Sequence, residues 1–201
     1  MTRLETRSLP EYFKEAVEET AAQLEVDISE LARFYLVDLL SRYTQAKALL
    51  EPEWGDRDKG FGQVLLESQG TSSEKRARIL RGIGDTTLFL SGFFSDSFQR
   101  SLVDIDYYAT IGRTAYKNLE SLLALRIVDW GLEGVFEELS ERFLQVVDMF
   151  AEISEAAGTQ RSGDILRIYE RWLRTRSPRD RRLLREAGIL PIEDSTPEIR
   201  H

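Results

Sequence analysis

The sequence contains no cysteine and a single histidine, His201, which stands at its last position. The lack of cysteine excludes disulfides, thiolate metal sites and a cysteine nucleophile. Without an internal histidine there is no candidate for a Ser-His-Asp triad, for histidine acid–base catalysis or for a histidine metal site. We therefore expect no catalytic residue, no metal site and no cofactor. These absences favour a non-enzymatic protein.

A phosphate-binding loop and a long apolar run are also missing. Gly82 and Gly84 form too short a motif for a nucleotide cradle, and the Lys-Ser or Lys-Thr pair of such a loop is absent. The most apolar stretch, residues 83–94, falls short of the roughly 20 residues of a membrane span and contains Asp85. Residues 1–7 lack the apolar segment of a secretory signal. We expect a soluble, cytoplasmic protein without a membrane span.

The charge of the chain is negative overall but unevenly distributed. The net charge of −8 argues against general nucleic-acid binding. Residues 1–158 carry 17 basic and 28 acidic residues, a net of −11, whereas residues 159–188 carry nine arginines against four acidic residues, a net of +5. One hypothesis is that this basic segment contacts an acidic protein partner. The alternative is that its arginines solvate the outer helix faces or pair with the acidic body. The candidate partner-binding residues are Arg171, Arg174, Arg182 and Arg185.

The N-terminal part of the chain predicts two helices that fold against each other. Ser8 followed by Pro10 and Glu11 has the spacing of a capping box, and Asp27 with Glu30 repeats it before a second helix. The apolar residues of this second helix recur at helical spacing, so we expect them to form one core-facing stripe. The stripe consists of Leu31, Phe34, Tyr35, Leu39 (or Val37), Leu40 and Tyr43.

The remaining chain also has helical periodicity, and no stretch alternates as a strand does. A helix over about 74–94 is apolar on most faces, which is typical of a helix surrounded by others. The next helix extends to about Val128, and Asp104 and Asp106 at its start are interpreted as capping residues rather than metal ligands. Further helices are predicted over 132–157, 164–174 and 178–188.

The predicted fold class is all-α. We expect a compact single-domain bundle of about seven or eight helices over residues 1–188, arranged around the central apolar helix at about 74–94. Residues 189–201 contain two prolines and are expected to form an extended C-terminal tail.

Three small residues of the central helix, Gly84, Thr87 and Ser91, fall on one face. A glycine inside a helix costs about 1 kcal/mol relative to alanine, so something must offset this cost. Gly112 on the following helix is the natural partner for a close approach of the two backbones. A ligand slot that uses the same close approach is the alternative.

Asp85 is a carboxylate within the most apolar part of the chain. An isolated buried carboxylate is costly, so it must be neutral, hydrogen-bonded or paired. We expect its partners to come from Arg81, Tyr107, Tyr108 and Tyr116. Three interpretations are open: a buried polar clamp between helices, a ligand-binding site, or a side chain that faces solvent. The ligand-binding site would consist of Asp85, Tyr108, Arg113 and Tyr116.

The same region carries an extended motif. Gly84–Ser97 reads Gly-Asp-x-x-Leu-Phe-Leu-x-Gly-Phe-Phe-x-x-Ser, and it is followed by Asp106-Tyr-Tyr and by Gly112-x-x-Ala-Tyr116. This pattern looks like that of a family of bacterial all-helical proteins with no assigned activity. The run that begins at Phe34 is similar to the N-terminal part of that family. The resemblance implies a bacterial, cytosolic, helical protein, and it brings no catalytic residue or cofactor.

Two functions fit these observations. The first, which we favour, is a non-enzymatic protein-interaction or regulatory module that works through its arginine-rich C-terminal face or its acidic N-terminal face. It implies a protein partner or a homodimer. The second is a small-molecule-binding protein or an enzyme of unfamiliar type, with a pocket at Asp85 and the Tyr107–Tyr116 helix. Binding to nucleic acid or to a membrane surface ranks third.

Overall fold

The computed structural model describes residues 8–43, 54, 59–93 and 105–156. The chain divides into two units, Met1–Gly158 and Thr159–His201, and every described residue belongs to the first. Every regular element in these described ranges is a helix, which confirms the all-α prediction. None of the described helices is long and apolar enough to cross a membrane. The predicted helices at 164–174 and 178–188, the tail at 189–201 and Asp104 lie outside the described residues.

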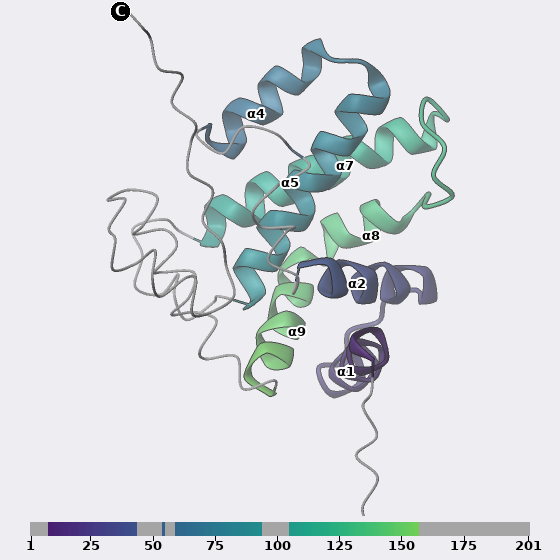
Figure 1. Ribbon diagram of the computed structural model, residues 1–201, viewed down its shortest axis with the longest axis vertical. Coiled ribbons are helices and arrows are strands. Elements are labelled where there is room, and N and C mark those ends of the chain that lie inside the picture. Colours follow the sequence, from purple (N-terminus) through teal and green to yellow (C-terminus); the bar gives the residue numbers. More distant parts are fainter. Residues whose placement is uncertain (1–7, 44–53, 55–58, 94–104, 157–201) are drawn as a thin grey trace, which may run out of the picture. The chain divides into compact units, whose positions relative to one another are not determined.

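Seven α-helices and one 3₁₀ turn make up the described part of the bundle, with α5 at its centre (Figure 1). They are α1 (Leu9–Gln23), α2 (Glu30–Tyr43), α4 (Phe61–Glu67), η1 (Ser68–Gly70), α5 (Ser73–Phe93), α7 (Ile105–Ala124), α8 (Val135–Glu141) and α9 (Phe143–Ala156).

The central helix α5 is surrounded as its apolar sequence predicted. It packs most extensively against α7 and α9, and it also contacts α2, α4 and η1. Residues 82–89 are all buried, so no face of this segment is left for solvent. A helix buried on every side needs apolar or small residues all round, which explains the lack of a polar face.

The glycines of α5 and α7 allow these two helices to approach closely. A Cβ atom on Gly84 would overlap the ring of Tyr116, and one on Gly112 would overlap Thr87 and the ring of Phe143. The predicted contact between Gly112 and the small-residue face of α5 is therefore confirmed. Protein side chains fill the space beside both glycines, and their packing offsets the cost of glycine in a helix.

Two helix boundaries differ from the sequence prediction. Helix α7 ends at Ala124 rather than near Val128, because the chain reverses at Arg126, which has a left-handed backbone (φ 51°). The single helix expected over 132–157 is two helices, α8 and α9, separated at Arg142. At this break Nε of Arg113 donates a hydrogen bond to the carbonyl of Ser140 at 3.1 Å. This side chain from α7 thus helps to satisfy the end of α8.

Helix α2 differs from prediction in its cap and in its buried stripe. Ser29, rather than Asp27, caps it: the hydroxyl of Ser29 accepts a hydrogen bond from the amide of Ala32 at 3.1 Å. The prediction that Leu31 and Phe34 face the core is wrong, since they are 42% and 75% exposed. The buried residues follow a cleaner helical spacing of i, i+3, i+4, i+7, i+8 and i+11. They are Ala32, Tyr35, Leu36, Leu39, Leu40 and Tyr43.

Candidate functional site

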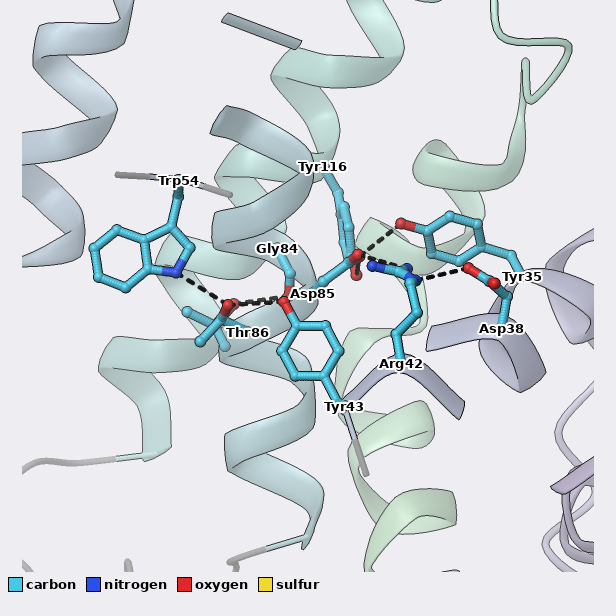
Figure 2. Close-up of polar contacts among 10 residues, drawn as sticks. Tyr35, Asp38, Arg42, Tyr43, Trp54, Gly84, Asp85, Thr86 and Tyr116 are labelled. Carbon is cyan, nitrogen blue, oxygen red and sulfur yellow. Dashed lines mark hydrogen bonds and ion pairs between the residues drawn. The ribbon is translucent and has the colours of Figure 1, made fainter. Parts of the chain in front are cut away.

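Asp85 lies at the centre of a buried polar cluster that joins three helices. Its side chain on α5 is fully buried, so the solvent-facing interpretation is wrong. Tyr35 on α2 and Tyr116 on α7 donate hydrogen bonds to Oδ1, at 2.6 and 2.8 Å. Nη2 of Arg42 on α2 donates to Oδ2 at 3.0 Å. Figure 2 shows these groups converging on the carboxylate. The cluster ties α2 and α7 to the middle of α5.

The surroundings of the cluster shift the pKa values of its members. Burial raises the pKa of Asp85 above its usual value, while the charge of Arg42 and the hydrogen bond from Tyr35 oppose this rise. Burial and the adjacent Asp85 carboxylate hold the pKa of Tyr35 and of Tyr116 well above 10. Both phenols therefore keep their protons at neutral pH and act as hydrogen-bond donors.

Arg42 connects the buried cluster to the surface. Its Nε donates to Oδ2 of Asp38 at 2.8 Å, while its Nη2 binds Asp85. The side chain of Arg42 is 30% exposed and that of Asp38 is 56% exposed, so the ion pairs extend from the core to solvent. Desolvation lowers the pKa of Arg42, but the charge of Asp85, the hydrogen bond to it and the charges of the other nearby acidic groups together outweigh this effect, and the pKa is raised. One cation thus serves two carboxylates.

A second polar contact fixes the C-terminal end of α2. The hydroxyl of Tyr43 lies 2.9 Å from Oγ1 of Thr86 on α5, and the indole Nε1 of Trp54 donates to the same oxygen at 3.1 Å (Figure 2). Trp54 is itself buried, and its ring packs on Phe61 with centroids 4.8 Å apart. Together with the Asp85 cluster, this contact sets the rotation of α2 about its own axis.

The four residues predicted to bind a ligand do not all lie together. Asp85 and Tyr116 are hydrogen-bonded partners. Tyr108 is half-buried, and its ring packs on Phe61 and Tyr107 with centroids 5.8 and 5.6 Å apart. Arg113 is exposed, and its Nε binds the carbonyl of Ser140 at 3.1 Å, where α7 meets α8. The predicted partner-binding arginines, Arg171, Arg174, Arg182 and Arg185, lie outside the described residues.

Sequence reasoning missed Tyr35 and Arg42, the two partners of Asp85 that come from α2. A signal for them was present, because the two residues are seven positions apart and so share one helix face with Leu39. What the sequence did not indicate is that this face packs on the middle of α5, more than 40 residues away along the chain. That contact depends on tertiary packing, which local periodicity does not report.

The chemistry open to the cluster follows from its donors and acceptors. A carboxylate offers about four acceptor positions, and three donors already occupy the two oxygens of Asp85. The arrangement therefore suits a polar clamp that orients α2. No group of three His, Cys, Asp or Glu side chains within the described ranges is placed to hold a metal ion.

The outer side of α2 has the opposite character. Phe34 is the most exposed of the large apolar side chains in the described residues, and Leu31 lies one turn earlier on the same side. The neighbouring residue in sequence, Tyr35, points inward to Asp85. A helix held firmly by its polar inner contacts thus presents an unpaired aromatic ring on its outer side.

Fold and cluster together define an all-α bundle in which a buried aspartate joins three helices. Comparison with family models, with curated proteins and with solved structures found no match. The resemblance drawn from the Gly84–Ser97 pattern therefore stays a prediction, and function must be argued from the residues themselves.

Proposed function

We propose that this protein is a non-enzymatic protein-interaction module and that the outer side of α2 is part of its contact surface. The observation that carries the proposal is the 75% exposure of Phe34, with Leu31 42% exposed one turn away. Isolated apolar side chains on a surface are common, whereas exposed apolar side chains that lie together are a feature of contact sites.

Burial of such a ring against a partner contributes substantially to the binding free energy. Fully covering a phenylalanine side chain contributes roughly 1.5–3 kcal/mol, and about 1.4 kcal/mol changes an affinity tenfold. The gain is larger when the surface needs no ordering before it binds. Tyr35, Arg42 and Tyr43 hold α2 on the bundle through hydrogen bonds that are buried or partly buried, so Phe34 is presented by a helix that is already in place.

A second candidate function, a small-molecule site at Asp85 and the Tyr107–Tyr116 segment of α7, has less support. A buried carboxylate with a shifted pKa and two phenol neighbours is a common feature of binding sites. Against it stands the occupation of both Asp85 oxygens by Tyr35, Tyr116 and Arg42. As to location, the family resemblance favours the cytosol of a bacterium.

Native mass spectrometry of the tagged full-length chain, purified from its own host, tests both candidates. We expect a protein complex that is lost in a Phe34→Asp variant and kept in a Leu144→Asp variant. Leu144 is a matched control, because it is an apolar residue with 47% exposure on a different helix, α9. Equal complex in all three preparations would contradict the proposal. A small molecule retained by the wild type and lost with Asp85→Asn would favour the second candidate.

A further inference from the structure

We propose that the outer side of α2 binds a basic amphipathic helix of a partner protein. This inference rests on the proposed function and names the chemical class of the partner. Its starting point is the outer stripe, defined as Leu31, Phe34 and Val37. These three residues are spaced three apart on α2, and they are exposed or half-buried.

The outer stripe is straight, narrow and short. Its three side chains follow one line along α2, because residues three apart on a helix are surface neighbours. From Leu31 to Val37 the stripe extends about 9 Å along this helix of 14 residues, at 1.5 Å per residue. A linear apolar stripe of this length matches the apolar side of another helix, which places its anchors at i, i+3 or i+4, and i+7.

Carboxylates flank the outer stripe at both ends. Glu30 lies four residues before Phe34 and Asp38 four residues after it, so each is one helical turn away, and both are exposed. The charged side chains that are exposed across residues 8–43 are eight carboxylates and one lysine. They are Glu11, Glu15, Glu18, Glu19, Glu25, Asp27, Glu30 and Asp38, with Lys14 as the lysine.

These negative charges favour a partner that carries positive charge. Lysine or arginine side chains beside the apolar anchors of an incoming helix would meet Glu30 and Asp38, and they would also be attracted by the other exposed carboxylates of residues 8–43. Phosphate-bearing surfaces, whether nucleic acid or anionic lipid, would be repelled by the same carboxylates. Asp38 can accept a new cation without leaving Arg42 alone, because Arg42 is also bound to Asp85.

The charge also disfavours a second copy of this chain as the occupant. In a two-fold symmetric contact the same surface patch lies on both copies, so that if residue i of one copy meets residue j of the other, j also meets i. An antiparallel pairing of two α2 helices about Phe34 would place Glu30 opposite Asp38 of the other copy. A parallel pairing would place each of these residues opposite itself. Both arrangements bring carboxylates together, whereas a basic helix would place positive charges beside Glu30 and Asp38.

The test uses the full-length protein and a fluorescein-labelled peptide of about 18 residues, or five helical turns. The peptide contains leucine at helical spacing with lysine at all other positions, and a second peptide has glutamate in place of every lysine. Fluorescence anisotropy measures the two affinities. We expect the leucine–lysine peptide to bind and the leucine–glutamate peptide to bind at least about tenfold more weakly, a difference of about 1.4 kcal/mol.

Matched variants separate binding at α2 from general attraction to an acidic protein. Phe34→Asp should lower the affinity for the leucine–lysine peptide about tenfold or more, whereas Leu144→Asp should leave this affinity within about twofold of the wild-type value. Glu30→Lys should lower the affinity for this peptide about threefold and make the affinity depend less on salt concentration. Glu152→Lys on α9 should change the affinity less. Circular dichroism verifies folding, and Leu31→Asp replaces Phe34→Asp if the latter does not fold.

Three outcomes would overturn the inference. They are equal binding of the two peptides, equal loss with Phe34→Asp and Leu144→Asp, and a dimer of the chain itself that dissociates with Phe34→Asp in light scattering. The last result would identify a second copy as the occupant. A native complex that depends on Phe34, together with no preference for the lysine peptide, would refute this inference but leave the proposed function standing.

Discussion

Asp85 shows how a single residue can depend on contacts that its neighbours in sequence do not provide. It is fully buried, yet Tyr35, Arg42 and Tyr116 supply three hydrogen bonds from two other helices. Burial of a lone carboxylate would be prohibitive, and these donors are what make it tolerable. The clamp is therefore a cooperative feature, in which the loss of one member leaves the others buried and poorly paired.

Replacement of Asp85 by asparagine tests this dependence. The amide has two donor hydrogens where the carboxylate has only acceptors, so at least one of them must face Tyr35, Tyr116 or Arg42, which are themselves donors. We expect Asp85→Asn to lower the free energy of unfolding by about 2–4 kcal/mol in urea denaturation at neutral pH.

Asp38→Asn is the matched control for that experiment. Asp38 pairs with the same arginine at 2.8 Å, but its side chain is 56% exposed, and exposed ion pairs contribute only about 0–1 kcal/mol. A loss of similar size in the two variants would contradict a role for Asp85 as a buried clamp and would assign the effect to Arg42 alone.

At the scale of elements, the contact between α5 and α7 is the most extensive in the described residues, and glycine makes it possible. In Gly84→Ala the new methyl group would overlap the ring of Tyr116, which is fully buried and bonded to Asp85. Overpacking of this kind costs about 1–3 kcal/mol, more than the roughly 1 kcal/mol that alanine gains in a helix. We expect Gly84→Ala to lower the thermal midpoint of unfolding.

Gly62→Ala on α4 provides the opposite case. The nearest atoms to an added Cβ at Gly62 are 3.9 Å away, on Ile111 and Tyr107, so the methyl group fits. Helix propensity should then dominate and raise the stability by up to about 1 kcal/mol. If Gly84→Ala and Gly62→Ala shifted the thermal midpoint equally and in the same direction, the close approach of α5 and α7 at Gly84 would be contradicted.

The elements also show what the sequence could and could not predict. The all-α class and the central position of α5 follow from periodicity and from the absence of a polar face, and both are confirmed. Pairing of Gly112 with the face of α5 that carries Thr87 followed from the cost of glycine in a helix. These features are local or involve neighbouring helices.

The features that failed depend on contacts distant in the chain. Leu31 and Phe34 satisfy the spacing of a core stripe, but α2 is rotated so that Tyr35 and Arg42 reach Asp85, and this rotation leaves Phe34 exposed. The helix expected over 132–157 breaks where Arg113 of α7 binds the carbonyl of Ser140. Tyr116 is an expected partner of Asp85, because it lies on the next long helix along the chain. Spacing alone does not indicate the partners of Asp85 from α2 or the carbonyl of α8 that Arg113 binds.

At the scale of the whole molecule, the two phenols that are hydrogen-bonded to Asp85 couple stability to alkaline pH. The pKa of Tyr35 and of Tyr116 is held well above 10 in the folded chain by burial and by the charge of Asp85. In the unfolded chain both ionise near pH 10. The folded state therefore binds about two more protons than the unfolded state once the pH passes 10. Their contribution to stability is complete below pH 10 and is lost as the pH rises beyond it.

Two retained protons correspond to a fall in the free energy of unfolding of about 2.7 kcal/mol per pH unit above pH 10, or 1.36 kcal/mol for each group. Urea unfolding at a series of pH values measures this slope, and absorbance of the ionised phenol counts the tyrosines that titrate before unfolding. Because Tyr35→Phe removes one of the two groups, it should lessen the slope by about half of this amount. Tyr12→Phe is the control, because this half-buried ring of α1 packs on Phe13 rather than on the Asp85 cluster, and it should leave the slope unchanged. Ionisation of all the tyrosines near pH 10 in the folded protein would show that Asp85 does not hold its two phenols in the protonated state, and the clamp would then lose its electrostatic basis.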